Sequence, residues 1–182
     1  GESLFGATSI AAGGNFSLAL LGLSDGMIYS WGDNSYGQLG SAAITVTVDD
    51  NDRLLPGMVM QYVDAGLKES VSVAAGGYHA FALIKRGDGS SGVYGWGLND
   101  KGQLSAGTST QGPFYANCTY TPLAVTDASG AALAAPVEKV AAGYKHSLFL
   151  MGDNTKMVMG TGDNSSGQLG LQENGTAVKE FE

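Results

Sequence analysis

The residue types that most often carry chemistry are sparse in this sequence. His79 and His146 are its only histidines, and as a pair they would suggest a metal site or acid–base chemistry. Both close the same Ala-Ala-Gly-x-x-His pattern, so we interpret them as equivalent positions of a repeat with a packing role. No Ser–His–Asp or Cys–His arrangement accompanies them. We therefore expect a protein that is not an enzyme, with no catalytic residue, no metal and no cofactor.

Two short runs of residues resemble known ligand-binding motifs. Residues 87–92 (Gly-Asp-Gly-Ser-Ser-Gly) match the dinucleotide fingerprint, which functions only where a helix begins. A strand-like run follows at 93–96, so we interpret 87–92 as a hairpin turn. Residues 49–52 (Asp-Asp-Asn-Asp) offer oxygen ligands but lack the alternating spacing and closing Glu of a calcium loop. We interpret them as a solvated acidic turn.

Four Asn-x-Ser/Thr sequons are the remaining candidate sites, and they begin at Asn15, Asn117, Asn164 and Asn174. Chance predicts about one such match in a chain of this composition, so the excess favours N-linked glycans. Asn117 and Asn174 are the preferred carriers, because they lie in polar, loop-like surroundings outside the repeated motif. The sequons therefore favour an extracellular or secretory-pathway location over a cytoplasmic one.

The excess of acidic over basic residues limits the classes of binding partner that this chain can have. There are 17 acidic and 9 basic residues, a formal net charge of −8, and no run of Lys and Arg stands out. Nucleic acid is therefore not expected as a direct partner. No apolar stretch reaches the roughly 20 residues that span a bilayer, so direct membrane insertion is not expected either. Cys118 is the only cysteine, which excludes a disulfide within the chain and leaves a bridge to another chain open.

The sequence contains three copies of one repeat, and the fold of this repeat determines where the candidate residues lie. Ala-Ala-Gly occurs at 11–13, 74–76 and 141–143. A ten-residue motif follows each copy and reads WGDNSYGQLG, WGLNDKGQLS and TGDNSSGQLG. Its glutamine recurs at a constant interval, as Gln38, Gln103 and Gln168. Chance does not keep such a pattern at constant spacing three times, so the repeat determines the fold.

Each repeat contains the pattern of short strands and tight turns. Between Ala-Ala-Gly and the ten-residue motif, two apolar runs flank Gly, Asp or Asn residues, which suit hairpin turns. A proline-containing run recurs at 55–59 and 121–125, and further apolar runs at 71–73 and 137–140 lead into Ala-Ala-Gly. Four short strands per repeat predict the blades of an all-β propeller, with Ala and Gly nearest its axis.

The Ala-Ala-Gly, Trp-Gly-x-Asn and Gly-Gln-Leu-Gly series resembles the regulator-of-chromosome-condensation repeat over nearly the whole chain. The resemblance implies a β-propeller, usually of seven blades, of which three repeats form an incomplete part. Phe16 departs from the pattern at the histidine position, Thr161 at the tryptophan position and Ser105 at the closing glycine. Within this fold we expect each Gln to bond the backbone of its own loop and each Trp ring to lie between blades.

The repeats divide the chain into one array with units at about 9–70, 71–137 and 138–182. Three units do not close a ring, so we expect residues 1–182 to belong to a longer chain or to an assembly of subunits. The connecting segments 41–54 and 105–120 differ most between repeats. The first contains a strand-like run at 44–48, and the second contains Phe114, Tyr115 and Tyr120, which would be binding anchors if exposed. The alternative is that both are only long connections.

Three functions remain open at this stage. The leading one is a non-catalytic protein-binding or assembly scaffold, whose partners are another protein or further subunits. The second is a structural subunit of an extracellular or organelle-surface assembly. The third is the guanine-nucleotide exchange known in the founding members of the resembled family. Exchange would need a complete ring and a loop that engages the GTPase, and the sequence identifies neither.

Overall fold

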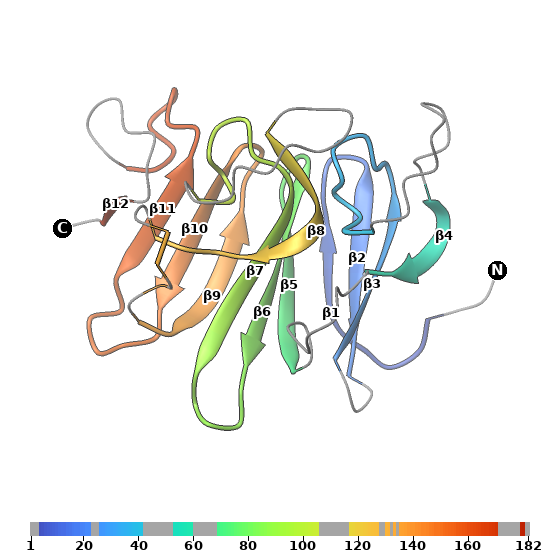
Figure 1. Cartoon of the computed structure of the whole chain (residues 1–182), viewed down its shortest axis with the longest axis horizontal. Coiled ribbons are helices and arrows are strands. Elements are labelled where there is room, and N and C mark those ends of the chain that lie inside the picture. Colours follow the sequence, from blue (N-terminus) through green and yellow to red (C-terminus); the bar gives the residue numbers. More distant parts are fainter. Residues whose placement is uncertain are drawn as a thin grey trace.

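The computed structural model describes residues 4–22, 26–41, 53–59, 69–105, 117–127, 130–131, 133 and 135–170, together with the backbone of 179–180. In these ranges the chain forms three antiparallel four-stranded sheets that stand side by side, as Figure 1 shows. The described residues contain no helix, and so none that could span a membrane. The expected all-β blades of an incomplete propeller are confirmed.

Each sheet, or blade, takes four consecutive strands in chain order. Blade 1 contains β1 (Ala7–Ala12), β2 (Phe16–Leu21), β3 (Met27–Gly32) and β4 (Arg53–Met58). Blade 2 contains β5 (Ser70–Ala75), β6 (His79–Lys85), β7 (Ser91–Leu98) and β8 (Cys118–Ala124). Blade 3 contains β9 (Val137–Ala142), β10 (His146–Met151), β11 (Val158–Gly162) and β12 (Lys179–Glu180). The proline-containing runs form β4 and β8, which close the outer edges of their sheets by pairing with β3 and β7.

The glycine-rich run at 87–92 is the hairpin turn between β6 and β7. Arg86 N donates to Ser90 O over 2.8 Å, and Gly89 takes a positive φ of 85° that L side chains rarely adopt. A strand follows the turn, so no helix N-terminus is present to hold a pyrophosphate. The interpretation of this run as a hairpin turn is confirmed.

The Ala-Ala-Gly strands bring neighbouring blades together at their inner edges. Gly14 N donates to Gly77 O and Gly77 N donates to Tyr144 O, both over 3.1 Å. A Cβ atom at Gly13 would overlap the ring of Phe16, and the same holds for Gly76 with His79 and Gly143 with His146. The glycine therefore makes room for the ring that follows it three residues later. This explains why Phe can replace His in that column.

Two hydrophobic cores lie between the blades. Alternate residues of β2, such as Leu18 and Leu20, face blade 2 and pack against Ala80, Ala82 and Ile84 of β6. The opposite side of β6 presents Phe81 and Leu83 to Phe149 and Met151 of blade 3. The central blade is therefore covered on both faces.

The outward faces of blades 1 and 3 are more open. Ile10 on β1 is 76% exposed, whereas Val73, its equivalent on β5, is 8% exposed inside the first core. Val158 on β11 is 36% exposed, whereas its equivalent Ile28 is 3% exposed. Ile10 and Val158 are therefore apolar repeat positions that no neighbouring blade of the described chain covers, whereas an adjacent blade covers their equivalents.

Candidate functional site

The glutamine column stabilises the ten-residue turns. In each turn the Gln Oε1 accepts a hydrogen bond from the backbone N–H two residues earlier. The pairs are Gln38 with Tyr36, Gln103 with Lys101 and Gln168 with Ser166, each at 2.8 Å. In the same turns Asn34, Asn99 and Asn164 accept from the backbone of Leu39, Leu104 and Leu169. The expected structural role of the glutamines is confirmed.

The tryptophan column links blades. Trp96 is fully buried between blades 1 and 2, and its Nε1–H donates to the backbone oxygen of Gln38 over 2.9 Å. The expected place of this ring between blades is confirmed. Trp31 lies half-buried on the open side of blade 1. Thr161 replaces the ring in blade 3, and its Oγ1 donates to Gly102 O over 2.7 Å.

Ser147 takes over the missing indole hydrogen bond between blades 2 and 3. Its Oγ donates to the backbone oxygen of Gln103 over 2.9 Å and lies 2.9 Å from His79 Nε2. Because the single hydroxyl proton points to Gln103, the hydrogen of the His79 bond must be on Nε2. Sequence reasoning missed this role, since a serine beside a histidine carries no specific signal.

His79 is a packing residue in this arrangement. Burial first, and then the charge of the neighbouring His146, lower the pKa of His79 from 6.5 to about 3. The ring is therefore neutral near pH 7 and packs edge to face on Phe81, with ring centroids 5.5 Å apart. His79 and His146 lie on different strands of adjacent blades, as the repeat predicts. Within the described residues no three His, Cys, Asp or Glu side chains group closely enough to hold a metal ion.

The sequons lie in different surroundings. Asn117 and Asn15 are exposed, and Asn117 immediately precedes β8. Asn164 is half-buried, and its Oδ1 accepts from Leu169 N over 2.9 Å. Asn174 lies outside the described residues.

Cys118 begins β8 and is buried, so its thiol is shielded from other chains in this state.

The aromatic anchors expected in segment 105–120 are not supported by its one described member. Tyr120 is buried in β8 and packs against Gly37 of blade 1, so for this residue the condition of exposure is not met. Phe114 and Tyr115, the strand-like run 44–48 and the acidic run 49–52 all lie outside the described residues.

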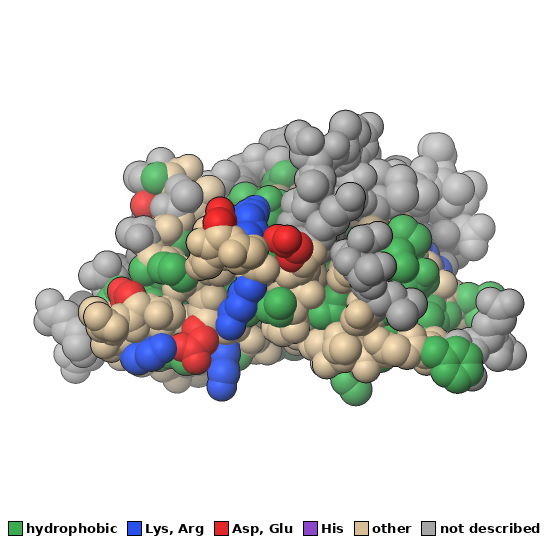
Figure 2. All heavy atoms as spheres, turned by 90° about the horizontal axis from the view of Figure 1, so that it is seen from below, with side chains coloured by type: hydrophobic (Ala, Val, Ile, Leu, Met, Phe, Trp, Pro, Cys, Tyr) green, Lys and Arg blue, Asp and Glu red, His purple; other side chains and the backbone are tan. Residues whose placement is uncertain are grey.

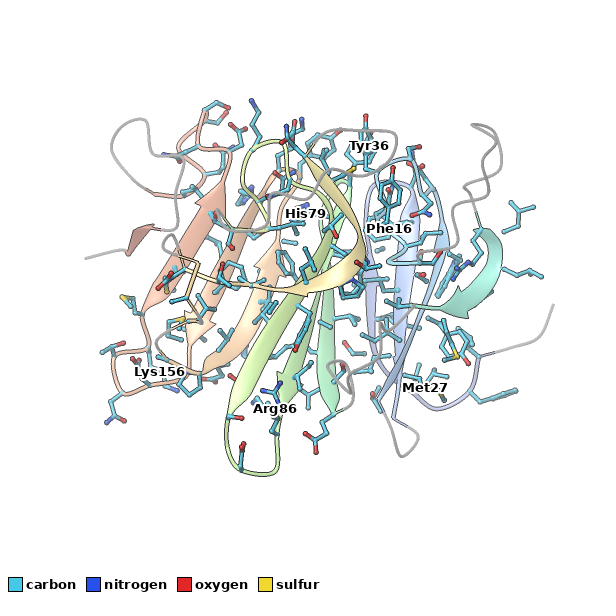
Figure 3. All side chains as sticks on the ribbon, viewed as in Figure 1. Phe16, Met27, Tyr36, His79, Arg86 and Lys156 are labelled. Carbon is cyan, nitrogen blue, oxygen red and sulfur yellow. The ribbon has the colours of Figure 1, made fainter. Side chains whose placement is uncertain are left out.

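Three other tyrosines form a row across the blades, which we call the tyrosine row. Tyr36 follows β3, Tyr78 precedes β6 and Tyr144 precedes β10. The centroids of Tyr36 and Tyr78 are 5.1 Å apart and those of Tyr78 and Tyr144 are 5.8 Å apart, both edge to face. Tyr144 is 61% exposed. In Figure 3, Tyr36 lies at the end of the blades opposite Arg86 and Lys156.

The tyrosine row was not found from the sequence, because its members are not one repeat column. They occupy three different positions of the repeat, where the other copies have Lys, Ser, Asn or Gly. One feature of the sequence could have revealed the row. Each of its tyrosines stands at a repeat position where the other two copies have a residue that is not aromatic. The repeat pattern therefore does not account for the row.

Charged groups surround the row. Lys145 Nζ lies 2.7 Å from Asp100 Oδ2, and Asp33 is close enough to Tyr78 to raise its pKa. The largest cause of that rise is the hydrogen bond between the Tyr78 and Tyr144 hydroxyls, which are 3.5 Å apart. All these groups suit binding through rings, hydroxyls and carboxylates. None of them is an activated nucleophile.

The other end of the blades presents charges of both signs. Lys156 pairs with Glu138 over 2.6 Å, and Lys139 and Lys85 also lower the pKa of Glu138. Figure 2 shows blue and red side chains mixed on this face. Sequence reasoning missed the grouping of these lysines, because they come from β6, β9 and the turn before β11.

The family assignment follows from comparison with known repeats. One model of the "Regulator of chromosome condensation (RCC1) repeat" matches residues 25–83 and 90–150. A second RCC1 repeat model matches residues 7–38, 71–103 and 137–168, which begin at or close to β1, β5 and β9. The chain belongs to the RCC1 repeat family.

Several curated proteins share these RCC1 repeats. "Probable E3 ubiquitin-protein ligase HERC6" of Homo sapiens is 35% identical over 88% of this chain and 13% of its own length. "Protein pim1" of Schizosaccharomyces pombe is 30% identical over 94% of this chain and 28% of its own length. The "Secretion-regulating guanine nucleotide exchange factor" of Mus musculus is 30% identical over 80% of this chain and 26% of its own length. The chain therefore spans less than a third of each of these relatives.

Solved RCC1 propellers have the same fold. Human WBSCR16 superposes with a TM-score of 0.76 at 24% identity, covering 99% of this chain and 42% of that chain. Yeast RCC1 (Prp20), solved with Kap60, superposes with a TM-score of 0.72 at 22% identity, covering 97% of this chain and 36% of that chain. The three blades thus correspond to part of a propeller.

Proposed function

We propose that this RCC1-repeat chain is a non-catalytic protein-binding or assembly module. The observation that supports the proposal is the tyrosine row, in which Tyr36, Tyr78 and Tyr144 converge from three blades. Tyrosine offers a large, rigid contact area with a hydroxyl at its tip, at a low cost in side-chain entropy. Such residues carry much of the binding energy in protein interfaces.

The rigid support of the row strengthens this proposal. Tyr36 N–H is held by Gln38 Oε1 within the ten-residue turn, and the Tyr144 ring packs over Gly77. The backbone link from Gly77 to Tyr144 fixes blade 3 against blade 2. A surface whose members are fixed before binding loses little conformational entropy when a partner arrives.

The related solved structures agree with protein partners. Yeast RCC1 was solved bound to Kap60, and Prp20p from Saccharomyces cerevisiae is described as binding Gsp1p and histones. Because the chain spans only part of these proteins, their partners are not transferred to it. They support only the class of partner, which is protein.

Guanine-nucleotide exchange is a second candidate, favoured by the name of the mouse relative. It can be tested by following release of a fluorescent guanine nucleotide from purified small GTPases with the native full-length protein. Acceleration that is lost in the Tyr36→Ala variant would favour exchange at the tyrosine row. A structural subunit of an extracellular assembly stays a third proposal, linked to the sequons.

A comparison of captured proteins tests the leading proposal. The native full-length protein and its Tyr36→Ala and Tyr144→Ala variants are immobilised and exposed to extracts of the cells that express it. We expect specific proteins that the wild type retains and both variants lose. Phe5→Ala is the matched control, because Phe5 is an exposed aromatic residue outside the row. Equal retention by wild type and both tyrosine variants would overturn the proposal.

A further inference from the structure

We propose that the tyrosine row and Asp33 together bind an arginine side chain presented by a segment of a partner protein. This inference rests on the proposed function and names the chemistry that its surface recognises. It depends on an acidic group without a cation, on aromatic rings beside it, and on the lysine that already lies beside the same rings.

Asp33 provides the acidic group. Its Oδ1 accepts hydrogen bonds from Ser35 N over 2.8 Å and from the Ser35 hydroxyl. Within the described residues, no Lys or Arg lies within ion-pair distance of Asp33, whereas Asp100 is paired with Lys145. Within the described residues the second carboxylate oxygen of Asp33 accepts no side-chain hydrogen bond and pairs with no cation.

The rings provide a surface for the same cation. A cation over a tyrosine face is attracted by the ring quadrupole. Tyr36 follows Asp33 closely in the chain, and Asp33 is close enough to Tyr78 to raise the pKa of its hydroxyl. The rings of Tyr36 and Tyr78 meet edge to face at 65°, so their faces point in different directions.

Lys145 is a cation of the protein itself beside the row, and its pairing with Asp100 favours its charged form. Its pKa is raised, first by the hydrogen bond to Asp100 and also by Tyr144 and Tyr36. An ammonium group of the protein itself thus lies beside the tyrosine row, paired with Asp100. Asp33 also lies close to the row, and among the described residues it has no lysine or arginine within ion-pair distance.

Arginine fits Asp33 and the neighbouring rings better than lysine. Its planar guanidinium can stack on a tyrosine ring while its N–H groups bond a carboxylate, and the ammonium of lysine cannot do both. An acidic segment would meet Asp33 and Asp100 as well as a chain with a formal net charge of −8. The preferred partner is therefore a segment that carries arginine on an otherwise neutral or basic stretch.

The probe is a capped twelve-residue peptide with four arginines separated by Gly and Ser, labelled for fluorescence anisotropy. Peptides with Lys or Glu in place of Arg are the comparison. With the full-length protein at low salt we expect the Arg peptide to bind about threefold more tightly than the Lys peptide, and the Glu peptide not to bind. Equal binding of the Arg and Glu peptides would overturn the inference.

Variants locate the site. Asp33→Asn keeps the acceptor for Ser35 and should weaken binding of the Arg peptide about fivefold, and Tyr36→Ala about threefold. Tyr78→Phe keeps the ring and should leave the affinity unchanged. Asp88→Asn is the matched control, because Asp88 Oδ1 accepts from Ser90 N over 2.8 Å in a similar turn at the other end of the blades. Equal losses in Asp33→Asn and Asp88→Asn would show attraction by net charge alone and overturn the inference.

The two proposals fail in different ways. If the Arg peptide does not bind but Tyr36→Ala still loses captured proteins, the arginine site is overturned and the protein-binding surface stands. If neither the peptide nor any captured protein depends on the tyrosine row, both proposals are overturned.

Discussion

The indole Nε1 of Trp96 donates a hydrogen bond to the backbone oxygen of Gln38, 2.9 Å away in the blade before it. Gln38 in turn uses its side chain to hold the backbone of its own turn. The ten-residue motif of one blade and the tryptophan of the next blade therefore form one continuous set of bonds. This relationship explains why the two features occur together in the repeat.

Trp96→Phe should lower the free energy of unfolding by about 1–3 kcal/mol, because the buried oxygen of Gln38 loses its donor. Urea unfolding followed by circular dichroism measures the change. Trp31→Phe is the matched control, since Trp31 is half-buried on the open face of blade 1. We expect that variant to lose less than about 1 kcal/mol. A similar loss in both variants would contradict the role given to the Trp96 bond.

Ser147→Ala should lower the free energy of unfolding by about 2 kcal/mol or more, since both Gln103 O and His79 Nε2–H lose their partner in a buried place. Ser17 occupies the equivalent position on the half-buried outward side of blade 1, so Ser17→Ala should change stability by about 0.5 kcal/mol or less. The same unfolding experiment compares them. A neutral Ser147→Ala variant would show that Ser147 does not replace the indole bond.

His79 should make the fold sensitive to mild acid. The pKa of His79 is 6.5 in its ordinary state and about 3 in the fold, mainly because of burial. The folded state therefore disfavours the protonated ring, so stability is full above pH 6.5 and falls as the pH drops from 6.5 towards 3. Carboxylates such as Asp100, whose pKa lies below 3.8 in the fold, contribute a separate loss at lower pH.

Urea midpoints measured between pH 7 and pH 5 test the effect of His79. His79→Phe is the matched variant, because Phe16 already occupies this position in blade 1. We expect its midpoint to be flatter over this range than that of the wild type. If both proteins lose stability in parallel, the titration belongs to another group.

The sequence predicted the blades well because the repeat determines them. Spacing and turn residues placed the hairpins, and the Gln column had to contact the same backbone in each copy. The tyrosine row could not be predicted in this way. Tyr36, Tyr78 and Tyr144 belong to different repeat positions, and only the offset between neighbouring blades brings their rings together. The exposure of Tyr120 stayed open for the related reason that it depends on which blade covers the strand.

Asn117 should carry an N-linked glycan in native material if the chain passes through the secretory pathway, as the sequons favour. Asn117 is exposed immediately before β8, where a bulky sugar costs little. Peptide mass spectrometry should find hexose on the peptides of Asn117 and Asn174. Asn164 should be less modified, because it is half-buried in the ten-residue turn, whose backbone its Oδ1 holds by accepting from Leu169 N. Bare asparagine at all four sequons would count strongly against secretion.

Residues 1–182 expressed alone should self-associate or remain loosely folded. Three blades do not close a propeller, since rings contain about four to eight. The open faces leave Ile10 and Val158 exposed at positions whose equivalents are buried in the cores. Apolar faces of this kind, beside sheet edges without a partner, promote association. We propose that further blades, from a longer chain or from other subunits, cover them in the native protein.

Analytical ultracentrifugation of the 182-residue chain measures this association, and one substitution pair identifies the surface responsible. Ile10→Lys adds a charge to the open face of blade 1 and should reduce association, because a buried lysine would have to lose its hydration. Leu54→Lys adds the same charge on β4, where Leu54 is 93% exposed on the outermost strand, and should leave association unchanged. A monodisperse monomer of 18.6 kDa that unfolds cooperatively would contradict the prediction. It would mean that three blades shield their own faces well enough to be stable without a ring.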